Sequence, residues 1–223
     1  MTFDKRVVLF MGHYGSGKTF TAVNYALAFV KQGLPVTIYD MDIVNPYFRT
    51  VDAAETLKKA GVELIVSPYA ETNVDIPAMN AASYKMVDDK TRYAVLDIGG
   101  DERGALALGR FYEKINEENN FDCLLVVNPY RPETSDFDGA IAIKNEIETV
   151  SRIKFTGIVN NANLGGETTA ENILYGLNFC EELGKKTGLP VKFSAVRENL
   201  CEKVQKQIDK VLPVAPIKYG DWL

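Results

Sequence analysis

The sequence predicts an α/β protein with a doubly wound, mostly parallel sheet and helices on both faces. Strand-like and helix-like segments alternate along all 223 residues, a pattern typical of parallel sheets. An apolar run, 7–11, leads directly into a glycine-rich loop and then into a helical pattern. The hydrophobic content of 46% is sufficient for a sizeable core. Because α/β domains often reach this length undivided, we expect one domain, 1–223.

The glycine-rich loop fills every fixed position of the phosphate-loop pattern G-x-x-x-x-G-K-[ST]. Its glycines let backbone N–H groups point at an anion, and the following helix adds unpaired N–H donors. In such loops the lysine, here Lys18, reaches the β- and γ-phosphates, and the hydroxyl, here Thr19, ligates Mg²⁺. The predicted nucleotide-binding residues are Gly12, His13, Tyr14, Gly15, Ser16, Gly17, Lys18, Thr19 and Phe20.

The first half of the chain continues the alternation of strands and helices. The residues Phe20, Val23, Leu27 and Val30 recur at helical spacing, and Gly33 fits a C-terminal cap. The expected segments that follow are strand 35–39, loop 40–49, helix 53–60, strand 62–66, surface connection 67–77, helix 78–88 and strand 93–96.

The second half repeats the pattern. Its expected segments are helix 105–116, polar stretch 117–120, strand 123–127, helix 133–150, strand 155–159, helix 169–187, strand 191–196 and helix 199–209. Thr134 or Ser135 is the expected cap of the helix 133–150. No strand is expected after 191–196, because Pro213 and Pro216 interrupt the tail.

Acidic residues follow two of the predicted strands, and an open parallel sheet binds ligands beyond the carboxyl ends of its strands. Asp97 ends an apolar strand, the position of the acid that supports Mg²⁺ in phosphate-loop proteins; turn capping is the alternative. Asp40 and Asp42 share a second strand end, where one of them would orient the attacking water or a magnesium-bound water. The spacing does not decide between the two, and turn capping stays open for either.

The residues after strand 155–159 bear on the choice of base. Asn160 offers both a donor and an acceptor to adenine. Guanine-specific phosphate-loop proteins place N-K-x-D at this point, whereas this chain has Asn160-Asn161-Ala162-Asn163, without a lysine or an acid. The run therefore favours ATP over GTP.

Composition argues against several partners. The net charge is −5, and no cluster of Lys and Arg provides a face for nucleic acid. The first six residues lack the apolar stretch of a signal peptide, and no membrane segment is expected. Cys123, Cys180 and Cys201 are too widely spaced for a metal site, and reduced thiols fit a cytoplasmic protein.

Together these motifs resemble the deviant P-loop ATPases of the MinD/ParA class, including the CobQ/CobB/MinD/ParA nucleotide-binding domains. The resemblance spans nearly the whole chain through Gly12–Thr19, Asp40-x-Asp42, Asp97-Ile98-Gly99-Gly100 and Val159-Asn160. It implies the P-loop NTPase fold, ATP and Mg²⁺ as ligands, and an ATP-dependent homodimer in which slow hydrolysis serves as a switch.

The resemblance also assigns roles to single residues. It implies phosphate and Mg²⁺ binding by Lys18 and Thr19, water positioning by Asp42, metal support by Asp97, adenine recognition by Asn160, and a place near the base for Arg197. The chain departs from the family at His13, which replaces the signature lysine that reaches the partner subunit's phosphates.

Three functions follow as hypotheses. The first is a Mg²⁺-dependent ATPase that acts as a nucleotide switch for a protein partner, in enzyme maturation or complex assembly. The second is an ATP-dependent small-molecule kinase or ligase of the dethiobiotin synthetase and CobQ/CobB kind, with Asn45, Arg49 and Arg131 as candidate anion contacts. The third is a binding module that does not hydrolyse ATP. The absence of an obvious acceptor-binding motif favours the switch, and a GTPase has less support.

Overall fold

The computed structural model describes residues 3–42, 49–66, 81–100, 108 and 111–217 of the chain. Its strands, in chain order, are β1 (Val7–Met11), β2 (Val36–Met41), β3 (Glu63–Val66), β4 (Tyr93–Ile98), β5 (Phe121–Val127), β6 (Gly157–Asn160), β7 (Val191–Arg197) and β8 (Val211–Val214). They form one eight-stranded sheet in the order β3-β2-β4-β1-β5-β6-β7-β8, and every neighbouring pair is parallel. The predicted α/β class with a parallel sheet is confirmed.

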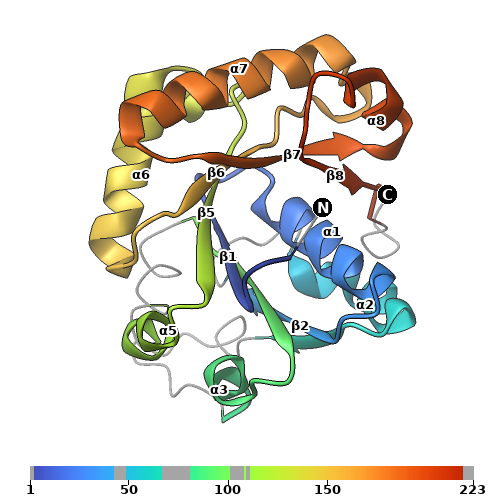
Figure 1. Cartoon of the computed structure of the whole chain (residues 1–223), viewed down its shortest axis with the longest axis vertical. Helices are drawn as coiled ribbons and strands as arrows, with labels where there is room; N and C mark the ends of the chain where they lie inside the picture. Colours follow the sequence, from blue (N-terminus) through green and yellow to red (C-terminus); the bar gives the residue numbers. More distant parts are fainter. Residues whose placement is uncertain (1–2, 43–48, 67–80, 101–107, 109–110, 218–223) are drawn as a thin grey trace.

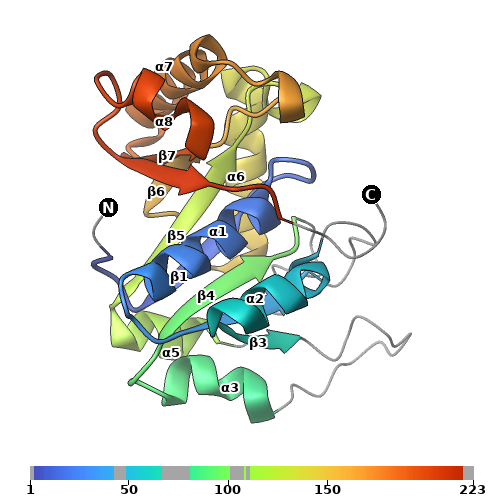
Figure 2. The same cartoon turned by 90° about the vertical axis from the view of Figure 1, so that its right-hand side faces the viewer.

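Helices cover both faces of this sheet. They are α1 (Lys18–Lys31), α2 (Ala54–Ala60), α3 (Ala81–Asp88), α5 (Tyr112–Glu118), α6 (Phe137–Ser151), α7 (Ala170–Thr187) and α8 (Glu198–Val204), with 3₁₀ turns η1 (Thr50–Ala53), η3 (Pro132–Thr134) and η4 (Gly165–Glu167). Figures 1 and 2 show α1 and α2 on one face and α3, α5 and α6 on the other. The sheet is therefore doubly wound, as predicted.

The central strand β1 contributes to both cores because its side chains alternate between the faces. Val7, Leu9 and Met11 pack with α3, α5, α6 and α7. Val8 and Phe10 pack with α1 and α2. All five side chains are buried, which explains why the sequence reads as a continuous apolar run rather than an alternating one.

The strand β8 corrects the expectation that the tail holds no strand. Its residues pair with β7 in parallel, with Pro213 opposite Val196, while Leu212 and Val214 are buried. Proline has no N–H for a second neighbour, so an edge strand accommodates it. If proline is interpreted only as a strand breaker, an edge strand is missed, because an edge strand needs a hydrogen-bonded neighbour on one side only.

The start of α6 is also later than predicted. Pro132–Thr134 forms η3, and the side chain of Asp136 accepts a hydrogen bond from the Gly139 N–H at 2.8 Å. Thr134 Oγ1 instead donates to the Asn128 carbonyl at 2.7 Å. The predicted cap at Thr134 or Ser135 is wrong, and Asp136 takes that role.

Another boundary also differs from the prediction. The helix expected at 199–209 ends earlier, since α8 stops at Val204. The connection 67–77 lies outside the described residues, as do 43–48 and the predicted helical residues 78–80 and 105–107.

Candidate functional site

The phosphate loop lies between the end of β1 and the start of α1. Gly15 and Gly17 have φ values of 77° and 86°, in the left-handed region that favours glycine. Gly12 is needed for space, because a Cβ there would lie 2.6 Å from the Val126 carbonyl oxygen. The loop thus depends on all three predicted glycines, two for conformation and one for close contact with β5.

The N-terminus of α1 is open to an anion. Gly17 is its N-cap, no side chain caps it, and its first turn carries no acidic residue. The first N–H groups of a helix have no partner within the helix, and they carry a partial positive charge. Lys18, only 5% exposed, begins this turn with Nζ 3.4 Å from the His13 carbonyl oxygen. This arrangement fits a bound phosphate.

Two buried acids flank the loop at the ends of β2 and β4. Asp40 and Asp97 are register partners across these strands, and both are fully buried. Thr50 Oγ1 donates to Asp97 Oδ2 at 2.8 Å. Arg49 Nη2 lies 3.2 Å from Asp40 Oδ2, and the backbone N–H of Asp42 donates to Asp40 Oδ1 at 3.2 Å. The sheet register therefore brings all three predicted acids to one edge.

Burial determines the electrostatics of these acids. Burial, and then the charge of Asp40, raise the pKa of Asp97 to about 7, while Lys18 and the Thr19 hydroxyl act in the opposite direction. Burial also raises the pKa of Asp40, and the charge of Arg49 opposes it most strongly. A cation beside Asp97 would offset the cost of keeping its charge in the interior.

The residues around Thr19 fit the Mg²⁺ that the fold implies. Asp97 Oδ1 and Ser16 Oγ are buried without a hydrogen-bond partner among the described residues. The same part of the chain contains no group of three or more His, Cys, Asp or Glu side chains that would hold a metal unaided. Mg²⁺ commonly takes one or two protein oxygens and completes its shell with phosphates and water. Thr19 and Asp97 would supply that donor set.

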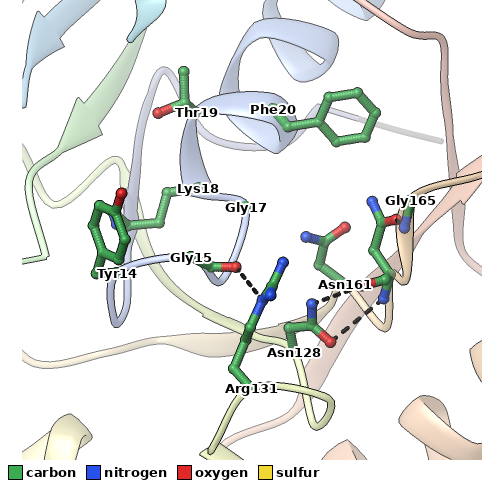
Figure 3. Close-up of a pocket in the computed structure, with 11 residues that line it drawn as sticks. Tyr14, Gly15, Gly17, Lys18, Thr19, Phe20, Asn128, Arg131, Asn161 and Gly165 are labelled. Atoms are coloured by element: carbon green, nitrogen blue, oxygen red, sulfur yellow. Dashed lines mark hydrogen bonds between the residues drawn. The ribbon is translucent and has the colours of Figure 1, made fainter. Parts of the chain in front are cut away.

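A pocket of about 450 Å³ opens beside the loop (Figure 3). Six of its lining residues belong to the predicted loop and first helical turn, and the others follow β5 and β6. They are Tyr14, Gly15, Gly17, Lys18, Thr19, Phe20, Asn128, Arg131, Asn161, Asn163 and Gly165. The pocket therefore joins three strand ends that lie far apart in the sequence.

The residues after β5 and β6 bind directly to the phosphate loop. Asn161 Nδ2 donates to the Ser16 carbonyl at 2.6 Å, and Arg131 Nε donates to the Gly15 carbonyl at 3.0 Å. Asn128 Nδ2 donates to the Asn163 carbonyl at 3.0 Å and links the two loops. Asn128, Asn161 and Asn163 were not predicted as site residues, and the only sequence signal for them was their place after a strand.

Five of the predicted nucleotide-binding residues do not line the pocket: Gly12 and Ser16 of the loop, and Asn160, Arg197 and His13. Asn160 is fully buried; its Nδ2 donates to the Ile173 carbonyl and to Ser194 Oγ, both at 3.0 Å. Arg197 is half-buried and occupies the N-cap position of α8 without a side-chain cap hydrogen bond. His13 is half-buried, with Nδ1 3.0 Å from the Tyr14 carbonyl oxygen and 3.7 Å from Glu133 Oε2. Their roles toward a ligand stay predictions.

Comparisons with known proteins identify the fold. No protein-family model matches the chain, and no curated protein does. Among solved structures, chloroplast FtsY from Physcomitrella patens is 18% identical with a TM-score of 0.59, over 87% of this chain and 59% of that chain. Cell division protein FtsY from Thermotoga maritima is 18% identical with a TM-score of 0.58, over 86% and 62%.

A third structure is the signal recognition particle receptor FtsY from Elizabethkingia anophelis in complex with GDP. It is 19% identical with a TM-score of 0.54, over 88% of this chain and 58% of that chain. The chain thus spans about three fifths of the length of these relatives. At such identities the likeness shows the fold alone, and that fold is the P-loop NTPase fold.

The helices were also compared with the requirements of a membrane span. Within the described ranges, none is both long enough and apolar enough to cross a bilayer.

Proposed function

We propose that this protein is a Mg²⁺-dependent ATPase of the MinD/ParA kind that acts in the cytoplasm as a nucleotide switch for a protein partner or a second copy of itself. The observation that carries the proposal is the convergence of the phosphate loop with the buried Asp97. The loop offers N–H donors and a buried lysine to phosphates. Asp97 leaves one buried carboxylate oxygen without a hydrogen-bond partner among the described residues.

The proposed roles follow from this geometry. Lys18 would neutralise charge on the β- and γ-phosphates, and Thr19 and Asp97 would hold the Mg²⁺, which would supply further charge neutralisation for phosphoryl transfer. Both carboxylate oxygens of Asp40 are held, Oδ1 by the Asp42 N–H and Oδ2 by the Val51 N–H. This supports assigning the attacking water to Asp42 rather than to Asp40.

The pocket supports ATP as the nucleotide. Asn161 and Asn163 contribute amides from the segment that follows β6, and no acidic residue appears among the described residues that line the pocket. An acid at that place would bind the amino group of guanine. The relative in complex with GDP makes GTP the natural comparison ligand.

One observation favours a second candidate function, a small-molecule kinase or ligase. Arg131 lines the pocket as a cation in addition to Lys18, which would suit an anionic acceptor. The other two candidate contacts add less. Arg49 already pairs with Asp40, and Asn45 lies outside the described residues.

A hydrolysis assay tests the proposed function. Phosphate release from ATP and GTP is measured with Mg²⁺ and with EDTA, on the wild type, Lys18→Ala and the surface control Lys206→Ala. We expect slow release from ATP that requires Mg²⁺ and is lost only in Lys18→Ala. Light scattering with a non-hydrolysable ATP analogue reports dimerisation.

The other outcomes have defined meanings. ADP production that requires an added metabolite would move the protein to the kinase or ligase class. Tight ATP binding without turnover would make it a binding module. Faster turnover of GTP than of ATP would overturn the choice of base.

A further inference from the structure

We propose that Arg131 is the residue on which the purine base of the bound nucleotide stacks, opposite Phe20. The inference deepens the proposed function and rests on it, because it takes a nucleotide as the ligand of the pocket. It names a base-binding side chain that follows β5, a part of the chain where the sequence predicted no base contact.

In the described part of the chain, the guanidinium of Arg131 is held by one hydrogen bond, and its other donors are available to a ligand. Its Nε donates to the Gly15 carbonyl at 3.0 Å, and its backbone N–H donates to the Asn128 carbonyl at 3.0 Å. The terminal nitrogens have no protein partner among the described residues. An anchored Nε fixes the plane of the guanidinium, and Figure 3 shows the group extending toward the loop across the pocket.

The two ends of the pocket are chemically different. Lys18 and Thr19 mark the phosphate end, at the start of α1. Asn163 and Gly165 mark the opposite end, after β6. A nucleotide whose phosphates occupy the first end has to extend its base toward the second. In Figure 3 the base would then pass between Phe20 on one side and Arg131 on the other.

The chemistry of this passage suits a planar aromatic ring. Guanidinium is planar, weakly hydrated and stacks on aromatic faces, whereas a lysine ammonium is compact and strongly hydrated. Phe20, which is half-buried, offers an aromatic face on the other side of the base. The bond to Gly15 holds Arg131 at an exposed residue of the loop, whereas Lys18 is buried. A stacking contact between Arg131 and the base therefore fits the geometry better than a contact between Arg131 and the phosphates.

Binding measurements with two ligands test the inference. The affinities of ATP and of inorganic tripolyphosphate, which has no base, are measured with Mg²⁺ on the wild type, Arg131→Ala and Arg131→Lys. The matched control is Arg152→Asn, since Arg152 is an exposed arginine with φ of 61° at the end of α6 and asparagine tolerates that conformation.

We expect Arg131→Ala to weaken ATP about tenfold, within the range measured for base stacking, and to leave tripolyphosphate unchanged. Arg131→Lys should recover only part of the loss, because charge without planarity does not stack. Unchanged tripolyphosphate binding also reports that the variants fold.

Three results would overturn the inference. Equal loss of ATP and tripolyphosphate would make Arg131 a phosphate contact, as an anionic acceptor site would predict. Unchanged ATP binding in Arg131→Ala would remove Arg131 from the ligand site while leaving the proposed function intact. A wild type that binds neither ligand would overturn the proposed function as well.

Discussion

Gly17 is the residue at which the phosphate loop, α1 and the end of β6 meet. Its φ of 86° lies in the left-handed region. A Cβ at this position would lie 2.2 Å from Asn161 Nδ2, the amide that holds the Ser16 carbonyl. A side chain here would therefore strain the backbone and also push Asn161 away from the loop.

Gly17→Ala and Gly33→Ala separate these two effects. Gly33 has a φ of 74° and open space around its Cα, so its substitution carries only the left-handed penalty of about 1–2 kcal/mol. That penalty corresponds to a melting temperature lower by roughly 4 °C for a chain of this size. Gly17→Ala should lower it by about half as much again, because a hydrogen bond of about 1 kcal/mol is also lost.

Thermal unfolding of both variants by circular dichroism provides the measurement. Equal melting temperatures for the two variants would show that Asn161 does not brace the loop.

The residues that line the pocket were only partly predictable. The loop itself follows from the sequence, because its pattern fixes the spacing of Gly12, Gly17 and Lys18. Which asparagine faces the pocket does not follow from the sequence. Asn160 belongs to β6 and faces into the protein, toward Ile173 and Ser194, and Asn161 faces the loop. Neighbouring strand residues point to opposite faces, and the sequence does not reveal where β6 ends.

At the scale of secondary structure, the start of α6 tests the corrected cap. Asp136 has extended backbone and its carboxylate accepts from the Gly139 N–H, the geometry of an N-cap. Ser135 Oγ donates to the Pro132 carbonyl and caps nothing in α6. Local sequence did not exclude Thr134 or Ser135, since serine caps about as well as aspartate and threonine also caps helices. Pro132 decided the outcome by starting a separate 3₁₀ turn.

Asp136→Ala should destabilise the protein by about 1 kcal/mol through the lost cap. Ser135→Ala, one residue away and equally exposed, should stay within about 0.5 kcal/mol of the wild type. Urea unfolding at neutral pH measures both values. A larger loss in Ser135→Ala than in Asp136→Ala would reinstate the cap predicted from sequence.

The strand β8 illustrates the same limit for strands. Four residues with a proline give little periodicity, and pairing with β7 decides their structure. By contrast, the long apolar runs of β1 and β5 were predictable because both faces of these strands are buried.

For the whole molecule, the amino ends of the strands are held by a buried arginine. Arg6 precedes β1 and forms an ion pair with Glu118 at the end of α5. It also donates to the carbonyls of Met86 and Asp89 at the end of α3. Burial raises the pKa of Glu118, but the hydrogen bonds and charges of Arg6 and Lys90 outweigh it and hold the pKa below its usual value.

This lowered pKa makes stability depend on pH in a defined direction. The ionised pair contributes fully to the free energy of unfolding above the pKa of glutamate in the unfolded chain, about 4.3. This contribution falls as the pH drops through the lower pKa of Glu118 in the folded protein. Glu118→Gln should therefore cost about 3 kcal/mol at pH 7, and the difference from the wild type should shrink toward pH 3.

Urea unfolding at several pH values measures this difference. The control is Glu182→Gln, which breaks an exposed pair with Lys185 and should cost less than about 1 kcal/mol. A difference between wild type and Glu118→Gln that stays constant from pH 7 to pH 3 would contradict the assigned role of the ion pair.

In the proposed function, the loop between β1 and α1 binds the triphosphate of ATP together with Mg²⁺. Isothermal titration calorimetry of ATP into the wild type and Lys18→Ala, each with Mg²⁺ and with EDTA, tests it most directly. We predict one ATP per chain for the wild type, weaker binding in EDTA, and a loss of at least about tenfold in affinity for Lys18→Ala, as expected when a buried charge pair is removed. Wild-type affinity in Lys18→Ala, or no heat of binding in the wild type at millimolar ATP, would contradict this role of the loop.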